Sequence, residues 1–140
     1  MFQYYARIQP DPDGGFLVTF PSVPEAITHG EDHSGALANA REALGLALRG
    51  YAEEGRPMPE ERTGDGVLVA VDVTDAMKLA VIEAFREAGI SKSELARRLG
   101  KAETEARRIL DPDHPTKLPM LEHALATLGK RIVIDMVDAA

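Results

Sequence analysis

The 140-residue chain is long enough for one ordinary domain or two small ones, and its hydrophobic content of 44% is sufficient for a packed core. It contains no cysteine, which excludes disulfides, thiolate metal sites and a cysteine nucleophile. No apolar run approaches the roughly 20 residues of a membrane span, and the N-terminal residues lack the layout of a signal peptide. We therefore expect a cytoplasmic protein with no membrane partner.

The net charge of -7 is unevenly distributed. Residues 1–74 contain 5 basic and 12 acidic side chains, whereas residues 75–140 contain 11 of each and all five lysines. An acidic first part would repel a phosphate backbone and attract a basic protein, although simple solubility explains the acidity equally well. The asymmetry predicts two domains, residues 1–74 and 75–140, with different partners.

The first domain is predicted to have the order strand, strand, strand, helix, strand. A hairpin is indicated by residues 2–9, which have strand composition with rough alternation, and by residues 16–20, on either side of the Pro- and Gly-rich turn 11–15. After an extended corner at 21–24, residues 26–30 can form a third strand. Asp32 or Ser34 then caps a helix whose apolar residues recur every three or four positions, ending at Gly55. Residues 67–73, almost entirely apolar, are predicted to form the last strand.

The second domain is predicted to be helical. Thr74 and Asp75 are expected to cap a helix over 76–88, and another helix is expected over 118–128. Residues Ile132 to Val137 are typical of a short closing strand.

Between these helices, residues 91–110 predict two short helices joined by a tight turn. Ser91 and Glu94 form a capping box, and Gly100 can take the left-handed conformation that ends the first helix. Ala106, Ile109 and Leu110 give the second helix an inner face. The pattern favours a helix–turn–helix over an ordinary helical hairpin.

The chain resembles the HicB-type antitoxins of toxin–antitoxin pairs in a series of motifs that follow the order found in that family. They are Asp13-Gly14-Gly15-Phe16, Phe20-Pro21-Ser22-Val23-Pro24, Thr28-His29-Gly30-Glu31, residues 36–44, residues 54–59, Glu94-Leu95-Ala96-Arg97-Arg98-Leu99-Gly100, Leu110-Asp111-Pro112, Lys117-Leu118 and residues 126–131. Together they extend over nearly the whole chain, and the second half is similar to Xre/Cro-type helix–turn–helix domains.

The resemblance implies an α+β protein: a small βββαβ, degenerate RNase-H-like domain, followed by an all-α helix–turn–helix domain with a short C-terminal strand. It also implies that the first domain binds and blocks a small, basic, RNA-cleaving, HicA-like toxin. The second domain would bind double-stranded operator DNA and repress its own promoter, as a dimer or higher homo-oligomer. Phe20, Pro21 and Pro24 are the candidate toxin contacts.

The candidate DNA contacts lie in and beside the helix–turn–helix. Phosphate contacts are expected from Lys92, Lys101, Arg107, Arg108 and Lys117, with Ser91 at the start of the motif. Thr104, Glu105 and Arg108 are expected to read bases, since a glutamate can accept a hydrogen bond from cytosine N4. Glu103 and Glu105 would oppose phosphate binding.

Two other functions remain open from the sequence. One is a stand-alone helix–turn–helix regulator whose α+β domain senses a signal or drives oligomerisation, without a toxin. The other is a metal-dependent nuclease, for which Asp11, Asp13, Asp32 and Asp72 are the candidate ligands. These aspartates show no obvious convergence and the histidines form no ligand set, so we expect no enzyme activity, no metal site and no cofactor.

Overall fold

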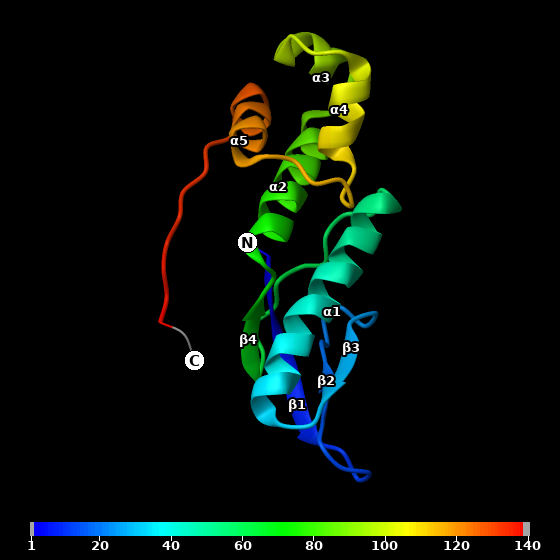
Figure 1. The fold of residues 1–140 in the computed structure, drawn as a ribbon, viewed down its shortest axis with the longest axis vertical. Helices are drawn as coiled ribbons and strands as arrows, with labels where there is room; N and C mark the ends of the chain where they lie inside the picture. Colours follow the sequence, from blue (N-terminus) through cyan, green and yellow to red (C-terminus); the bar gives the residue numbers. More distant parts are fainter. Residues whose placement is uncertain (1, 139–140) are drawn as a thin grey trace. The chain divides into compact units, whose positions relative to one another are not determined.

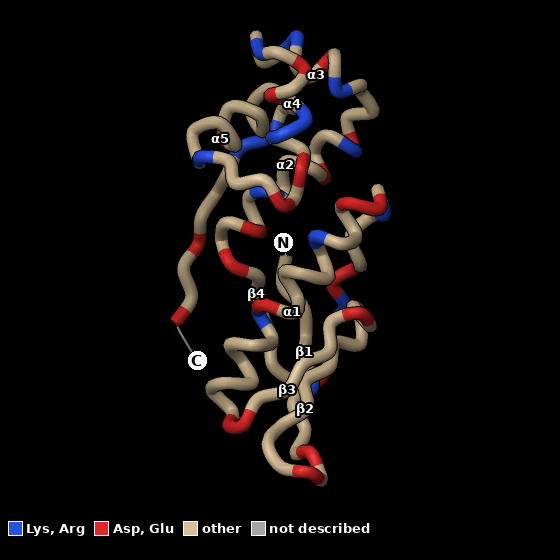
Figure 2. The backbone as a smooth tube through the Cα atoms, turned by 45° about the vertical axis from the view of Figure 1, so that its right-hand side comes forward, with Lys and Arg blue, Asp and Glu red and all other residues tan. Residues whose placement is uncertain are grey.

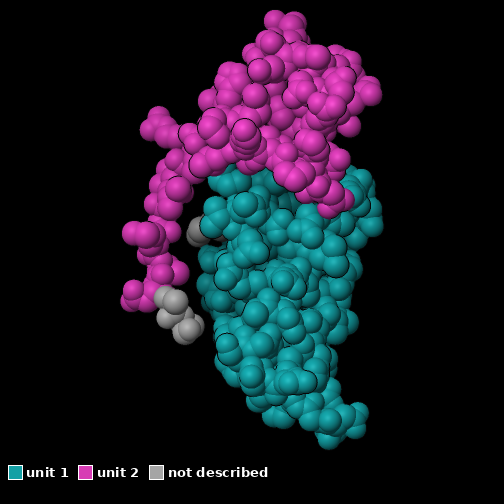
Figure 3. Space-filling model, in the orientation of Figure 1, with its two compact units in different colours: residues 1–79 teal, residues 80–140 magenta. Residues whose placement is uncertain are grey.

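The computed structural model describes residues 2–138, and the chain divides into two compact units, residues 1–79 and 80–140. Figure 3 colours unit 1 teal and unit 2 magenta. The outer ends of the two predicted domains, at residue 1 and at residues 139–140, lie outside the described residues.

Unit 1 is built on a four-stranded antiparallel sheet (Figure 1). The strands are β1 (Gln3–Pro10), β2 (Phe16–Thr19), β3 (Ile27–Gly30) and β4 (Val67–Ala70), in the order β3-β2-β1-β4. The register pairs Ile8 with Val18 and Val18 with Thr28. β3 and β4 are therefore the edge strands.

Helix α1 (His33–Glu53) covers one face of this sheet. Asp32 caps it, because the Asp32 carboxylate accepts a hydrogen bond of 2.6 Å from the Gly35 amide. The predicted three- and four-residue spacing places one stripe of α1 in the core. That stripe packs on the buried side chains of the sheet; its buried apolar members are Ala36, Ala40, Leu44, Leu48 and Tyr51. The α+β class and the βββαβ element order are confirmed.

The junction after β4 differs from the sequence prediction. The strand expected over 67–73 ends at Ala70, and α2 (Val73–Ala88) begins three residues before the predicted start at 76. The Ala76 amide already donates to the Asp72 carbonyl at 2.9 Å, so Thr74 and Asp75 lie within the first turn rather than at its cap. The prediction was wrong here because it rested on the apolar run alone. Val73, the last residue of that run, is exposed and begins α2 instead of pairing with a strand.

Unit 2 contains three more helices after the end of α2: α3 (Lys92–Leu99), α4 (Glu103–Leu110) and α5 (Leu118–Thr127). Its core is aliphatic, and the buried side chains of α3, α4 and α5 are Leu95, Ala96, Leu99, Ala106, Ile109, Leu110, Leu121, Ala124 and Leu125. None of the described helices has both the length and the hydropathy needed to span a membrane.

The C-terminal strand expected at Ile132 to Val137 is not formed. Residues 131–138 contain neither helix nor strand, although their β-branched composition favours a strand. A strand needs a partner for its backbone hydrogen bonds, and this segment pairs with no strand of its own chain.

Candidate functional site

The turn between α3 and α4 is formed by local hydrogen bonds that the sequence anticipates. The Ser91 hydroxyl accepts a bond of 3.0 Å from the Glu94 amide and caps α3. Gly100 ends the helix in the left-handed conformation, with a φ of 67°. The Lys101 amide then donates to the Ala96 carbonyl at 3.0 Å, which turns the chain toward α4.

The two helices are held together by their inner faces. Leu95 and Leu99 of α3 are buried, as are Ala106 and Ile109 of α4. This burial fixes α4 on α3 and leaves the polar residues of α4 on the outside, which is the arrangement that a helix–turn–helix requires.

We define the α4 face as the residues Thr104, Glu105, Arg107 and Arg108. Thr104 and the two arginines are exposed, whereas Glu105 is half-buried. The other predicted DNA contacts, Ser91, Lys92, Lys101 and Lys117, are also exposed. All eight predicted side chains are thus at least partly accessible on unit 2.

The charges around the α4 face are mixed. Residues 91–117 contain seven basic and five acidic side chains, and Figure 2 shows both kinds interleaved along α3 and α4. Glu103 accepts from Arg107 at 2.8 Å and Glu105 accepts from Arg108 at 2.9 Å. Each arginine of the α4 face is therefore paired with a glutamate of the same helix.

Sequence reasoning missed the part that Glu103 plays in joining the two helices. Its carboxylate also accepts a hydrogen bond of 3.0 Å from the Ser93 hydroxyl at the start of α3. This bond and the Arg107 guanidinium lower the pKa of Glu103. The four-residue spacing of Glu103 and Arg107 signals the ion pair, but no local pattern signals the bond to Ser93.

Glu94 forms a second charged cluster, on α3. It accepts hydrogen bonds from Arg97, the shortest at 2.6 Å, and from Arg98 at 3.0 Å. These two arginines, Arg97 above all, lower the pKa of Glu94 from 4.5 to about 2. Arg97 and Arg98 are thus engaged with their own helix rather than with α4.

The Pro-flanked corner of unit 1 consists of two successive turns. The Val23 amide donates to the Phe20 carbonyl and the Ala26 amide donates to the Val23 carbonyl, each at 3.0 Å. Pro21 and Pro24 are exposed, whereas Phe20 is only 1% exposed and belongs to the core. Of the three predicted toxin contacts, only the prolines offer accessible surface.

Next to this corner lies an open groove between α1 and the edge strand β3, which we call the α1–β3 groove. Small residues of α1 line it, together with Ile27 and Leu46, which are 61% and 65% exposed. The lining residues are Glu25, Ile27, Ala43, Leu46, Ala47, Gly50, Tyr51, Glu54 and Arg56. Sequence reasoning missed this groove because its walls are far apart in the chain.

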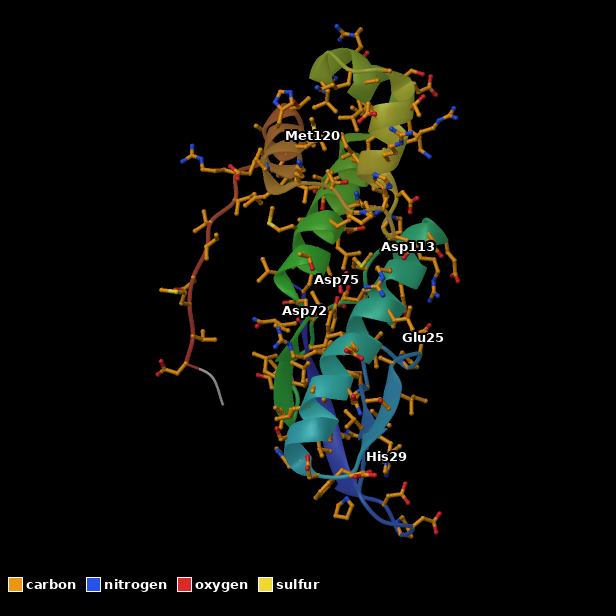
Figure 4. All side chains as sticks on the ribbon, viewed as in Figure 1. Glu25, His29, Asp72, Asp75, Asp113 and Met120 are labelled. Atoms are coloured by element: carbon orange, nitrogen blue, oxygen red, sulfur yellow. The ribbon has the colours of Figure 1, made fainter. Side chains whose placement is uncertain are left out.

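One end of the α1–β3 groove is charged. The Tyr51 hydroxyl donates to the Glu25 carboxylate at 2.7 Å, and the Arg56 guanidinium lies 3.9 Å from the centre of the Tyr51 ring. The bond from Tyr51 lowers the pKa of Glu25, while burial, followed by the bond to Glu25, raises the pKa of Tyr51. Figure 4 labels Glu25 at this corner.

Three of the four aspartates considered as nuclease ligands have side chains with a local structural role. Asp11 accepts from the Asp13 amide in the hairpin turn, Asp32 caps α1, and Asp72 pairs with Arg41 at 2.8 Å. Among the described residues, no group of three or more His, Asp or Glu side chains is arranged to hold a metal ion.

The fold and its surfaces define a class of protein: an acidic α+β unit followed by a helical unit that contains a helix–turn–helix. A family model described as "HicB_like antitoxin of bacterial toxin-antitoxin system" matches residues 3–80. The chain belongs to this family of HicB-like antitoxins.

Similar proteins extend the match to the whole chain. Antitoxin HicB of Escherichia coli (strain K12) is 34% identical over 137 residues, which cover 96% of this chain and 99% of that protein. Antitoxin HicB 2 of Photorhabdus laumondii is 35% identical and covers 93% of both chains. Antitoxin HicB of Pseudomonas fluorescens (strain Pf0-1) is 34% identical over 144 residues, covering 100% of this chain and 97% of that protein.

Proposed function

We propose that this antitoxin acts in the cytoplasm, that its first unit neutralises a small, basic, HicA-like, RNA-cleaving toxin, and that its second unit represses its own operon. The observation that carries the proposal is the similarity to antitoxins across both units, from end to end of the chain. No enzymatic step is part of this function, because blocking a toxin and occupying an operator both act by steric exclusion.

Toxin binding is assigned to the α1–β3 groove together with Pro21 and Pro24. The groove offers exposed apolar side chains next to Glu25 and Glu54, and residues 1–74 contain 12 acidic side chains against 5 basic ones. Apolar contacts supply affinity, while the acidic surroundings favour a basic partner. A toxin held there would have its RNA-binding surface covered by the antitoxin.

Operator binding is assigned to the α4 face, with Ser91, Lys92, Lys101 and Lys117 contacting phosphates beside it. Thr104, Glu105 and Arg108 would reach base edges in the major groove. Two second units in a dimer would place two such helices about one turn of DNA apart, so the operator should be a palindrome or close to one.

Toxin binding can be tested by using the full chain to capture proteins from an extract of its native host. Leu46→Asp places a charge in the groove, and Leu68→Asp makes the same change at an exposed leucine of β4. We expect the wild type and Leu68→Asp to recover a small basic protein that cleaves RNA once released, and Leu46→Asp to lose it. Equal capture by both variants would remove the groove from the proposal.

The same protein samples, tested for toxin capture and for DNA retardation, distinguish the proposed antitoxin function from that of a stand-alone regulator. If the wild-type chain recovers no small basic protein but still retards the DNA upstream of its own gene, the regulator without a toxin becomes the better account. Failure to retard that DNA would instead contradict the proposed binding of operator DNA by the second unit.

A further inference from the structure

The charged end of the α1–β3 groove surrounds one guanidinium group from three sides. The Arg56 guanidinium lies 3.9 Å from the centre of the Tyr51 ring, where cation–π attraction stabilises it. It donates to the Glu54 carboxylate at 3.2 Å and to the Glu25 carboxylate at 3.5 Å. An aromatic face flanked by carboxylates suits a planar guanidinium. We call Glu25, Tyr51 and Glu54 the guanidinium site.

The guanidinium site is held in place by contacts that do not involve the Arg56 side chain. Tyr51 belongs to the core, and its hydroxyl donates to the Glu25 carboxylate at 2.7 Å. That bond lowers the pKa of Glu25 and so keeps the carboxylate charged. Glu54 ends α1, and its amide donates to the Gly50 carbonyl at 3.1 Å. The ring and both carboxylates therefore belong to structured parts of unit 1.

The Arg56 side chain, in contrast, is held weakly. The side chains of Arg56, Glu25 and Glu54 are between 44% and 62% exposed, so water screens both ion pairs. Both hydrogen bonds are also longer than the about 2.7–2.9 Å that is usual between charged groups. The backbone is fixed separately, because the Arg56 amide donates to the Tyr51 carbonyl at 2.9 Å. The guanidinium can thus leave the ring without any change in the end of α1.

The surroundings of the site suit a second arginine, supplied by another molecule. Two carboxylates face one guanidinium, which leaves a net charge of -1 for a further cation. Ile27, Leu46 and Ala47 line the adjoining groove, and the aliphatic stem of an arginine packs on such a surface while its charged end reaches beyond it. A lysine ammonium would match the charge but would not stack flat on the ring or bridge the two carboxylates.

We propose that the guanidinium site binds an arginine side chain of the toxin, and that Arg56 occupies the site in the free chain as an internal competitor. The arginine of the toxin stacks on Tyr51 and pairs with Glu25 and Glu54, while Arg56 turns into solvent. The inference rests on the proposed function for the identity of the partner. Proteins bind the phosphates of RNA largely through arginines, so an arginine held here is withdrawn from RNA.

The site can be tested without the toxin, with ethylguanidinium as the probe for an arginine and ethylammonium as the matched probe for a lysine. NMR signals of the Tyr51 ring in the full-length chain report binding at constant ionic strength. We expect ethylguanidinium to shift these signals to saturation in Arg56→Ala, with a midpoint about tenfold lower than in the wild type, because a site that is vacant about a tenth of the time binds about tenfold more weakly. Ethylammonium should bind several-fold more weakly than ethylguanidinium.

Two further variants separate the site from a general effect of charge. Arg62→Ala removes the same charge from an arginine paired with Glu60, and its midpoint should equal that of the wild type. Adding Glu25→Gln to Arg56→Ala keeps an acceptor for the Tyr51 hydroxyl but removes one carboxylate, and should raise the midpoint several-fold. Equal midpoints for Arg56→Ala and the wild type, or equal binding of the two cations, would overturn the proposal.

Toxin capture by the same full-length variants keeps this inference apart from the proposed function. Arg56→Ala should release captured toxin more slowly than the wild type, Glu25→Gln more quickly, and Arg62→Ala at the wild-type rate. Equal release by all of them would remove the toxin's arginine from the site and leave the proposed function standing. If ethylguanidinium binds as expected but none of the chains captures a toxin, the proposed function fails while the guanidinium site stands.

Discussion

Arg107 and Arg108 supply the positive charge of the α4 face, yet each is already paired with a glutamate. Exposed ion pairs of this kind contribute little to stability because water and salt screen them, so a DNA phosphate could replace the glutamate at low cost. In the proposed function, Glu103 and Glu105 would then limit binding to sequences that do more than supply phosphates, which would favour operator DNA over non-specific DNA.

Replacing Arg107 should weaken binding to any DNA sequence. We expect Arg107→Ala to reduce operator affinity and to lower the slope of log affinity against log salt by about 1, because one phosphate contact is lost. Titration of labelled operator at several salt concentrations measures both effects.

The matched control is Arg86→Ala, since Arg86 is paired with Glu83 on α2 as Arg107 is paired with Glu103 on α4. Its salt slope should equal that of the wild type. A wild-type slope for Arg107→Ala would contradict the assignment of Arg107 to a phosphate.

The Glu94 cluster predicts a particular pH dependence of stability. Its folded-state pKa of about 2 lies below the ordinary 4.5, so the stabilisation is complete above pH 4.5 and disappears as the pH falls toward 2. Glu94→Gln should therefore have a lower urea midpoint than the wild type at pH 7, and the difference should shrink between pH 4.5 and 3.

Glu122→Gln serves as the comparison, because Glu122 is exposed on α5. The difference between its urea midpoint and that of the wild type should not vary over the same pH range. A gap between Glu94→Gln and the wild type that stays constant down to pH 3 would show that the arginines do not hold the carboxylate in its charged form.

At the scale of elements, the turn between α3 and α4 depends on one backbone conformation. Gly100 has a φ of 67°, and a Cβ added there would meet no atom within 4 Å. A side chain at this position is therefore opposed by conformation and not by crowding. The position of α4 on α3, and with it the α4 face, follows from this glycine and the buried contacts beyond it.

Two glycine substitutions isolate this effect. Gly100→Ala should lower the free energy of unfolding by about 1 kcal/mol, the cost of a left-handed alanine. Gly50 lies in α1 with open space around it, so Gly50→Ala should raise the free energy of unfolding by roughly 0.5–1 kcal/mol. Urea unfolding measures both, and shifts of the same sign would contradict the conformational explanation.

At the scale of the whole molecule, acidic and mixed-charge surfaces belong to different units. Acidic side chains outnumber basic ones 12 to 5 in the first 74 positions, whereas residues 75–140 contain 11 of each and all five lysines. Under the proposed function, a basic toxin would therefore be attracted to unit 1, whereas DNA would be repelled from it. One chain could thereby bind two partners of opposite charge.

This separation of charge predicts how fast the toxin is captured. The association rate constant of the full-length antitoxin with its toxin should fall as salt rises from 50 to 500 mM, roughly by tenfold or more, since electrostatic steering is screened. The dissociation rate constant should change much less, because apolar contacts of the groove would hold the proposed complex together. Stopped-flow association and dissociation measurements check both, and an association rate independent of salt would contradict the role of the acidic residues.

The sequence by itself determined the features that depend on neighbouring residues. The α+β class, the βββαβ order, the Ser91 cap and the left-handed Gly100 all follow from hydropathy period and capping patterns, whereas for α1 the sequence left Asp32 and Ser34 as alternative caps. The division of charge along the chain also needs no structure. Local hydrogen bonds and side-chain periodicity decide these features, and both can be inferred from the order of the residues alone.

Only the tertiary structure decided which side chains are accessible and which distant segments meet. It buried Phe20, which the sequence had offered as a toxin contact, and it brought Glu25 and Ile27 beside α1 to form the α1–β3 groove. It also left Ile132 to Val137 unpaired, against their strand composition. These outcomes depend on packing between residues far apart in the chain, or between chains, and no local pattern specifies such packing.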